Sequence, residues 1–155
     1  MRNFDSSADG EIRKPPGTSV RIAARVHNTG HDHRVNVTTA GSTQNVAISA
    51  KAKGSGSAVN GGEFLMLALA TCYCNDLYRE AARSNIAVDS VEVEAEADFD
   101  SVGLAATNIT YRARVVSTAS QAEIEALLRQ TDAVAEVQNT IRAGATVSLQ
   151  PWDDG

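Results

Sequence analysis

The chain has 155 residues, of which 43% are hydrophobic and 21% are charged, as in an ordinary soluble globular protein. The formal net charge is −5 at pH 7 and no basic block occurs, so the sequence lacks the electrostatic footprint of a nucleic-acid-binding protein. The longest apolar run, Phe64–Ala70, is too short to span a bilayer, and residues 1–17 contain no apolar signal segment. We therefore expect a cytoplasmic protein with reduced cysteines and with no membrane or nucleic-acid partner.

The N-terminal third predicts an arm followed by three strands. Residues 1–17 are polar and contain a Pro-Pro pair, and we expect a flexible arm there, followed by one domain over residues 18–155. Apolar and polar side chains alternate over residues 20–26, and residues 34–39 look like the return strand of a hairpin. A third strand is expected over residues 44–50, before a loop rich in Gly and Ser.

A long central helix is predicted after this loop. Asn60 can cap its first turn, and Glu63 can reach back to complete a capping box. From Phe64 to Cys74 the side chains are apolar apart from one threonine, which predicts burial on all sides. So short a chain has little protein with which to cover such a helix, so a second subunit is the expected source. The charged residues that follow are expected on an exposed face: Asp76, Arg79, Glu80 and Arg83.

The C-terminal half predicts two strands, a helix and a last strand. Residues 91–99 and 109–115 alternate strictly, so arginines of the second strand can face glutamates of the first. Ser120 and Glu123 form a second capping box, which opens a helix through about residue 131 or on to Arg142. A last strand is expected over residues 145–149. The predicted order is β-β-β-α-β-β-α-β, an α+β fold.

Two cysteines, Cys72 and Cys74, are the first candidates for chemistry. Side chains two apart on a helix point in different directions, so they cannot form an ordinary disulfide. An apolar helix interior raises the pKa of a thiol, so a reactive Cys72 needs a nearby cation. Arg25, Arg21 or Arg142 could supply it; alternatively the arginines are solvated and both thiols are inert core residues.

Asp76 follows Cys72 by four residues and so shares its helical face. It could orient a partner of the thiol or pair with Arg79 at the exposed end of the helix. The second interpretation is the simpler one.

Three histidines, His27, His31 and His33, lie near one predicted turn. His31 and His33 would share a strand face, so a metal site is one alternative. Asp32 is the one carboxylate nearby, and a solvated hairpin tip is the simpler interpretation. We expect no metal ion and no other cofactor.

Two segments resemble motifs of a known family. In Gly61–Cys72 an acidic residue precedes a run of Leu and Ala that ends in a cysteine, as in the central helix of the OsmC/organic-hydroperoxide-resistance family. Ala135–Arg142 resembles the second-helix motif of that family, and the resemblance covers roughly residues 20–149. It implies an intertwined homodimer with sites at the interface. It also implies a peroxiredoxin-like thiol peroxidase for organic hydroperoxides, whose first cysteine becomes a sulfenic acid.

The resemblance assigns roles residue by residue. Cys72 matches the attacking cysteine, Arg25 is our choice for the assisting arginine, and Glu63 is the candidate acidic residue. The resolving cysteine has no counterpart, because its position is Ala135. The peroxidase members place the acidic residue one position earlier, at Gly62, and one helical position is a rotation of about 100°. Glu63 can therefore serve as a cap without reaching the thiol.

Three hypotheses follow. The first is a one-cysteine thiol peroxidase that uses an external thiol reductant. The second is a non-catalytic member that binds a small apolar or electrophilic ligand in the interface pocket. The third is a purely structural role for both thiols. The residues expected to line the pocket beside Cys72 are Cys74, Tyr73, Gln138 and Asn139; Cys74 could also resolve a sulfenic acid across the dimer axis.

Overall fold

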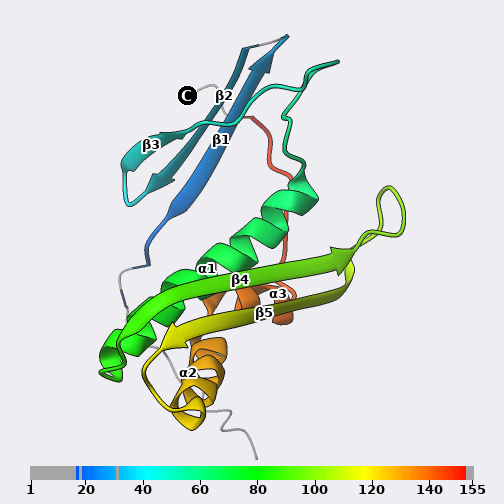
Figure 1. The fold of residues 1–155 in the computed structure, drawn as a ribbon. Coiled ribbons are helices and arrows are strands. Elements are labelled where there is room, and N and C mark those ends of the chain that lie inside the picture. Colours follow the sequence, from blue (N-terminus) through cyan, green and yellow to red (C-terminus); the bar gives the residue numbers. More distant parts are fainter. Residues whose placement is uncertain (1–16, 18, 31, 153–155) are drawn as a thin grey trace, which may run out of the picture. The chain divides into compact units, whose positions relative to one another are not determined.

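The computed structural model describes residues 17, 19–30 and 32–152 (Figure 1). They form two compact units, divided between Ala58 and Val59, and each is described by itself. The flexible arm expected over residues 1–17 lies outside the described residues except for Gly17, and the single domain over residues 18–155 stays a prediction. None of the described helices is both long enough and apolar enough to cross a membrane.

The first unit contains a three-stranded antiparallel sheet in the order β1-β2-β3. Its strands are β1 (Ile22–Thr29), β2 (Asp32–Thr39) and β3 (Ser42–Val46). All three were predicted, with shifted ends. The third strand ends at Val46, earlier than expected, because Val46 pairs with Val35 at the end of the β2–β3 ladder.

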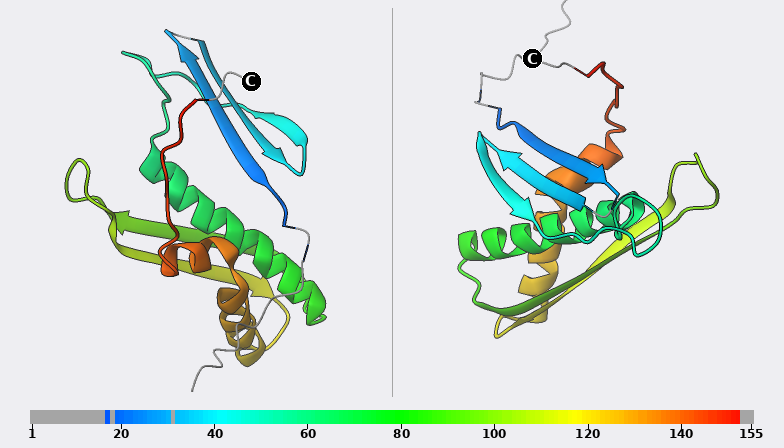
Figure 2. Two further views of the ribbon diagram at one scale, coloured as in Figure 1. Left: turned by 180° about the vertical axis from the view of Figure 1, so that it is seen from behind. Right: turned by 90° about the horizontal axis from the view of Figure 1, so that it is seen from above.

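The second unit contains a two-stranded antiparallel sheet and three helices. Its elements are α1 (Gly61–Arg83), β4 (Val88–Asp98), β5 (Thr107–Ser117), α2 (Gln121–Val134) and α3 (Glu136–Arg142). The long helix α1 lies along the β4–β5 hairpin, and both other helices contact α1 (Figures 1 and 2). The α+β class predicted from the sequence is confirmed.

Both predicted capping boxes are present. The side chain of Asn60 accepts a hydrogen bond from the Glu63 backbone N–H at 2.9 Å, and the Glu63 carboxylate accepts one from the Asn60 N–H at 2.7 Å. Ser120 and Glu123 make the same pair of bonds at the start of α2. These bonds satisfy backbone N–H groups that the helix itself leaves without partners, so each helix begins where the sequence predicts.

The β4–β5 hairpin has one charged face and one apolar face, as its alternation predicts. Glu92 lies opposite Arg114, and Glu94 lies opposite Arg112. The Glu94 and Arg112 side chains approach to 2.6 Å, and those of Glu92 and Arg114 to 3.4 Å. The other face packs on the helices through half-buried side chains: Val91, Val93, Tyr111, Ala113 and Val115.

The core of the second unit is built on one stripe of α1. The stripe recurs every four residues and comprises Leu69, Tyr73, Leu77 and Ala81. Three of its members, Tyr73, Leu77 and Ala81, pack with Leu127 of α2 and Ala135. The Tyr73 and Tyr111 rings meet edge to face at a centroid distance of 4.8 Å, a favourable aromatic geometry.

One expectation for α1 is wrong and another is not tested. Leu67 in the first half of the helix is 56% exposed in the single chain, and its cover by a second subunit stays a prediction. Asp76, expected on the exposed face, is 4% exposed. The reason is that α3 packs against α1 beside this residue, a contact that the local sequence pattern does not contain.

The C-terminal segment also differs from its prediction. Residues 145–149 form no strand, although the structure describes them, and Val147 and Leu149 are almost fully exposed. A strand needs a neighbour with which to share hydrogen bonds, and neither sheet of this chain pairs with the segment.

We expect Leu77→Ala to lower the free energy of unfolding by about 2–5 kcal/mol, because Leu77 is fully buried and its loss leaves a cavity. Leu104→Ala, in the loop between β4 and β5, is the matched control and should cost less than ~1 kcal/mol, since Leu104 is 62% exposed. Urea unfolding followed by circular dichroism measures both. Equal losses at the two positions would contradict the packing described.

Candidate functional site

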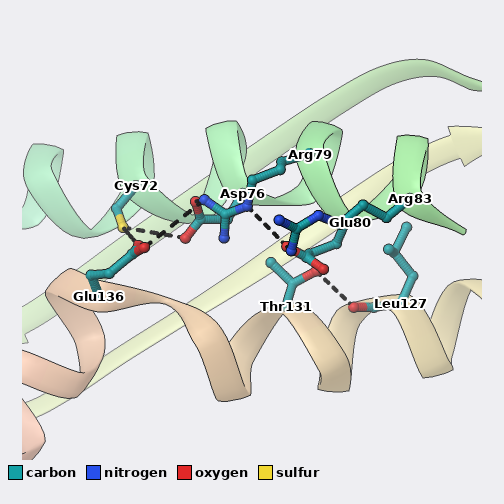
Figure 3. Close-up of polar contacts among 8 residues, drawn as sticks. All are labelled: Cys72, Asp76, Arg79, Glu80, Arg83, Leu127, Thr131 and Glu136. Carbon is teal, nitrogen blue, oxygen red and sulfur yellow. Dashed lines mark hydrogen bonds and ion pairs between the residues drawn. The ribbon is translucent and has the colours of Figure 1, made fainter. Parts of the chain in front are cut away.

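Cys72 lies on α1 where α3 packs against that helix. The contact is held by Gln138 of α3, which is 2% exposed and donates a hydrogen bond to the Leu69 carbonyl of α1 at 3.0 Å. Because Leu69 lies one turn before Cys72, this bond brings the first residue of α3, Glu136, beside the thiol (Figure 3). Cys72 itself is half-buried and not in a disulfide.

The thiol belongs to a chain of polar contacts along α1. Cys72 Sγ donates to Asp76 Oδ2 at 3.5 Å, and the other oxygen of Asp76 accepts a hydrogen bond from Arg79 at 2.6 Å (Figure 3). The spacings of four and three residues place these side chains on one helical face. Asp76 is thus a buried carboxylate held between a thiol and a guanidinium. The predicted pairing with Arg79 is present, and a role for Asp76 in orienting a partner of the thiol stays a prediction.

A second carboxylate approaches the same sulfur. Glu136 Oε2 lies 3.9 Å from Cys72 Sγ, and Glu136 Oε1 lies 4.0 Å from an Arg79 nitrogen. The Glu136 side chain is 73% exposed, in contrast to that of Asp76. A thiol has one hydrogen, so Cys72 can donate to either carboxylate but not to both.

This environment favours the neutral thiol. Burial raises the pKa of Cys72, the backbone N–H of Val137 opposes this, and the negative charges of Asp76 and Glu136 add to the increase. Burial also raises the pKa of Asp76, as does Glu136, while Arg79 lowers it. Both groups therefore hold their protons more firmly than the same groups in water.

The same atoms offer metal ligands. Donor atoms of Cys72, Asp76 and Glu136 all lie within 4.8 Å of one another. Arg79 already places a cation on Asp76, so the carboxylate whose charge would attract a metal ion is partly neutralised. We assign no metal to this cluster.

The structure places the predicted pocket residues differently from the expectation. Tyr73 is buried in the core, where its hydroxyl donates to the Leu128 carbonyl at 2.7 Å, so it does not face a ligand in this chain. Gln138 is committed to the α1–α3 contact. Asn139 donates to the Ala133 carbonyl across the break between α2 and α3, at 3.1 Å. Cys74 is half-buried and lies on another face of α1.

The predicted assisting residues do not meet Cys72 within the second unit. Glu63 caps α1 nine residues before Cys72, which corresponds to about 13 Å along the helix axis. Arg142 pairs with Asp132 at 2.6 Å, and Tyr111 also donates to that carboxylate. Arg25 lies on β1 in the first unit, and its role as the assisting cation stays a prediction.

The cation that contacts the two carboxylates beside Cys72 is Arg79, which the sequence analysis treated as a surface residue. Arg79 follows Cys72 by seven residues, which is about two helical turns, so the sequence spacing alone could have placed the two on one face of α1. Glu136 was missed because its approach depends on how α3 folds back on α1.

The two described histidines do not converge. His27 pairs with Arg34 and His33 with Asn28, so adjacent rungs of the β1–β2 ladder direct them to opposite faces. His27 bonds to Thr29 and His33 to Asn28. His31 lies outside the described residues, so the alternative of a metal site on His31 and His33 is not tested.

Comparison with known proteins identifies related folds. The family model described as OsmC-like protein matches residues 54–150. No curated protein matches the sequence. Solved structures of related fold include an OsmC-like protein from Mycoplasma pneumoniae, with a TM-score of 0.55 and 15% identity, covering 80% of this chain and 87% of that chain.

Two further structures are similar. An organic hydroperoxide resistance protein OsmC from Legionella pneumophila gives a TM-score of 0.52 at 21% identity, covering 79% of this chain and 89% of that chain. An OsmC-like protein of unknown function from Vibrio cholerae gives 0.53 at 16% identity, with coverages of 77% and 92%. At these identities the likeness establishes the fold.

The pKa of Cys72 can be read from alkylation rates. In a Cys74→Ala background, iodoacetamide should label Cys72 with a midpoint above that of a free cysteine, ~8.5, because burial and two carboxylates favour the protonated thiol. The rate should therefore be low at pH 7 and rise as the pH passes through the raised pKa. Glu136→Gln should move the midpoint down. A wild-type midpoint below 8 would contradict this description of the site.

Proposed function

The chain belongs to the OsmC-like protein family, and on that premise we propose that it reduces organic hydroperoxides with Cys72 as the nucleophile and an external thiol as the reductant. The related Legionella pneumophila structure is described as an organic hydroperoxide resistance protein, which supports this class of substrate. A reaction that consumes thiols requires a reducing compartment such as the cytoplasm.

One observation carries the proposal. Cys72 donates to Asp76, and Asp76 is held in turn by Arg79 on its other oxygen. A nucleophile, a base and a group that orients the base form the arrangement by which enzymes activate weak nucleophiles. Burial raises the pKa of Asp76, which makes it a stronger base than an exposed carboxylate and suits it to receive the thiol proton.

The chemistry follows from these positions. Asp76 accepts the thiol proton as the sulfur attacks the terminal oxygen of the hydroperoxide. A sulfur–oxygen bond forms and the oxygen–oxygen bond breaks, which leaves a sulfenic acid on Cys72 and an alkoxide. Asp76 then returns its proton to the alkoxide, which leaves as an alcohol. Arg79 holds the carboxylate in place throughout as a positioning residue.

Regeneration needs a thiol from outside the chain. The position of the family's resolving cysteine is Ala135, which is fully buried. An external thiol would displace water from the sulfenic acid to form a mixed disulfide, and a second thiol would release Cys72 and a free disulfide. Cys74 across a dimer axis is the internal alternative. We also propose a homodimer, because exposed apolar side chains such as Leu67 lie on α1.

Asp76→Asn separates the proposed proton relay from simple thiol reactivity. Alkylation by iodoacetamide needs a thiolate but no proton donor, so it should be unchanged or faster at pH 7 when a neighbouring negative charge is removed. Reduction of cumene hydroperoxide needs the returned proton and should fall by about 10²-fold. Both rates are measured in a Cys74→Ala background with dithiothreitol as the reductant.

Two controls define the result. Cys72→Ser should abolish both reactions. Glu123→Gln, which removes a carboxylate at the start of α2, should leave both rates unchanged. If the Asp76→Asn protein keeps its full hydroperoxide rate, Asp76 has no part in the reaction. If the parent protein leaves hydroperoxide untouched from pH 7 to pH 9, the proposed function is wrong.

A second candidate function is the binding of a small apolar ligand without turnover. It is favoured by a cleft of about 640 Å³ at the start of α1, where Met66 and Phe99 contribute apolar surface beside two carboxylates. The cleft is lined by Asn60, Gly62, Glu63, Met66, Glu96, Ala97 and Phe99. Met66 lies six residues before Cys72, so this cleft is separate from the thiol.

The neutral fluorophore N-phenyl-1-naphthylamine tests this candidate. Saturable binding that Met66→Lys abolishes and Cys72→Ser leaves unchanged is the expected result, because a buried ammonium makes the cleft unfavourable for an apolar ligand. A titration without saturation, or binding that Met66→Lys leaves intact, would rule out this cleft as the ligand site.

A further inference from the structure

The charges around Cys72 are unevenly divided between buried and exposed groups. Asp76 is buried and already paired with Arg79 at 2.6 Å. Glu136 is mostly exposed, lies 3.9 Å from Sγ, and reaches Arg79 only at 4.0 Å. The Glu136 carboxylate is therefore the weakly neutralised charge on the solvent side of the sulfur.

The cluster as a whole is negative. Arg79 is shared with Glu80 at 2.9 Å, and Glu80 also pairs with Arg83 at 3.1 Å. The three carboxylates outnumber the two guanidiniums by one. The charged members are Asp76, Arg79, Glu80, Arg83 and Glu136. Within the second unit, a reagent that approaches Cys72 from solvent thus meets a net negative charge, and Glu136 is the most exposed carboxylate of the cluster.

We propose that Glu136 is a specificity-determining residue that makes Cys72 react preferentially with cationic and neutral partners and disfavours anionic ones. On the proposed function, the reductant that regenerates Cys72 is then a thiol without a negative charge near its sulfur. The charge preference itself needs only an accessible thiol, so it can be tested whether or not the protein reduces hydroperoxides.

The physical basis is Coulombic attraction at short range. An attacking group must come within about 4 Å of Sγ, and at that point it lies close to the Glu136 carboxylate as well. The Glu136 charge lowers the activation barrier for a cationic reagent and raises it for an anionic one. The logarithm of the ratio of the two rates therefore contains the electrostatic effect twice. Such an interaction at an exposed site is weakened by salt.

Two methanethiosulfonate reagents of opposite charge measure the preference. In each, the Cys72 sulfur attacks the reagent's sulfenyl sulfur, a mixed disulfide forms and methanesulfinate leaves. The cationic reagent carries a trimethylammonium group and the anionic one a sulfonate. Their rate ratio on the full-length Cys74→Ala protein is divided by the ratio for free 2-mercaptoethanol, which removes the intrinsic difference between the reagents.

We expect this normalised ratio to exceed one at 20 mM salt, to fall by roughly 5-fold in Glu136→Gln, and to fall further in Glu136→Lys. Raising the salt to 1 M should remove most of the preference in the parent protein. The matched control is Glu125→Gln, which removes an exposed carboxylate of α2 that precedes Glu136 in the sequence by more than two helical turns. It should leave the ratio unchanged.

The outcomes are distinct. A normalised ratio near one that Glu136→Gln does not alter overturns the proposal, as does an equal change in the Glu125→Gln control. Circular dichroism verifies that each variant is folded, which the exposure of Glu136 favours. If the protein shows the charge preference but never consumes hydroperoxide, the role of Glu136 is supported and the proposed function is wrong. If it consumes hydroperoxide without a charge preference, the proposed function is supported and the role of Glu136 is wrong.

Discussion

The packing of one stripe of α1 sets the geometry on which the candidate site depends. Leu69, Tyr73 and Leu77 recur at intervals of four residues and face the core of the second unit. Cys72 and Asp76 each come one position before a member of this stripe, so they lie along its edge. When the stripe is buried against the hairpin and α2, that edge is directed toward α3. The site is thus a consequence of how the helix packs.

Some of this arrangement follows from sequence because local chemistry determines it. The alternation in β4 and β5 predicts the charged face, on which arginines of β5 lie opposite glutamates of β4, and the structure adds the register that pairs Glu94 with Arg112. The Asn60–Glu63 capping box predicts the start of α1, and the four-residue spacing of Cys72 and Asp76 predicts a shared face. Each of these features is determined by residues that are close in sequence or that pair in a regular β-ladder.

Other features required tertiary contacts that no local pattern encodes. The helix breaks at Ala135, which has an extended backbone but is neither Gly nor Pro, so the usual signals are absent. That break lets α3 fold back, which buries Asp76 and brings Glu136 to the thiol. The expected strand over residues 145–149 fails for the converse reason, because its pattern is correct but no neighbouring strand pairs with it.

Asp76 and Glu136 are both carboxylates, but they differ in burial and therefore suit different roles. Asp76, at 4% exposure, accepts the hydrogen bond of Cys72, and its burial raises its pKa and so strengthens it as a base. It is poorly placed to act on a distant reagent, because Arg79 neutralises it. Glu136 also raises the pKa of the thiol, but its side chain is 73% exposed and its field extends into the solvent beside the sulfur. Asp76 therefore suits proton transfer, and Glu136 suits selection of the reagent by its charge. Replacing Asp76 by a neutral residue should change the rate of hydroperoxide reduction, whereas the same change at Glu136 should change which charged reagents react with Cys72.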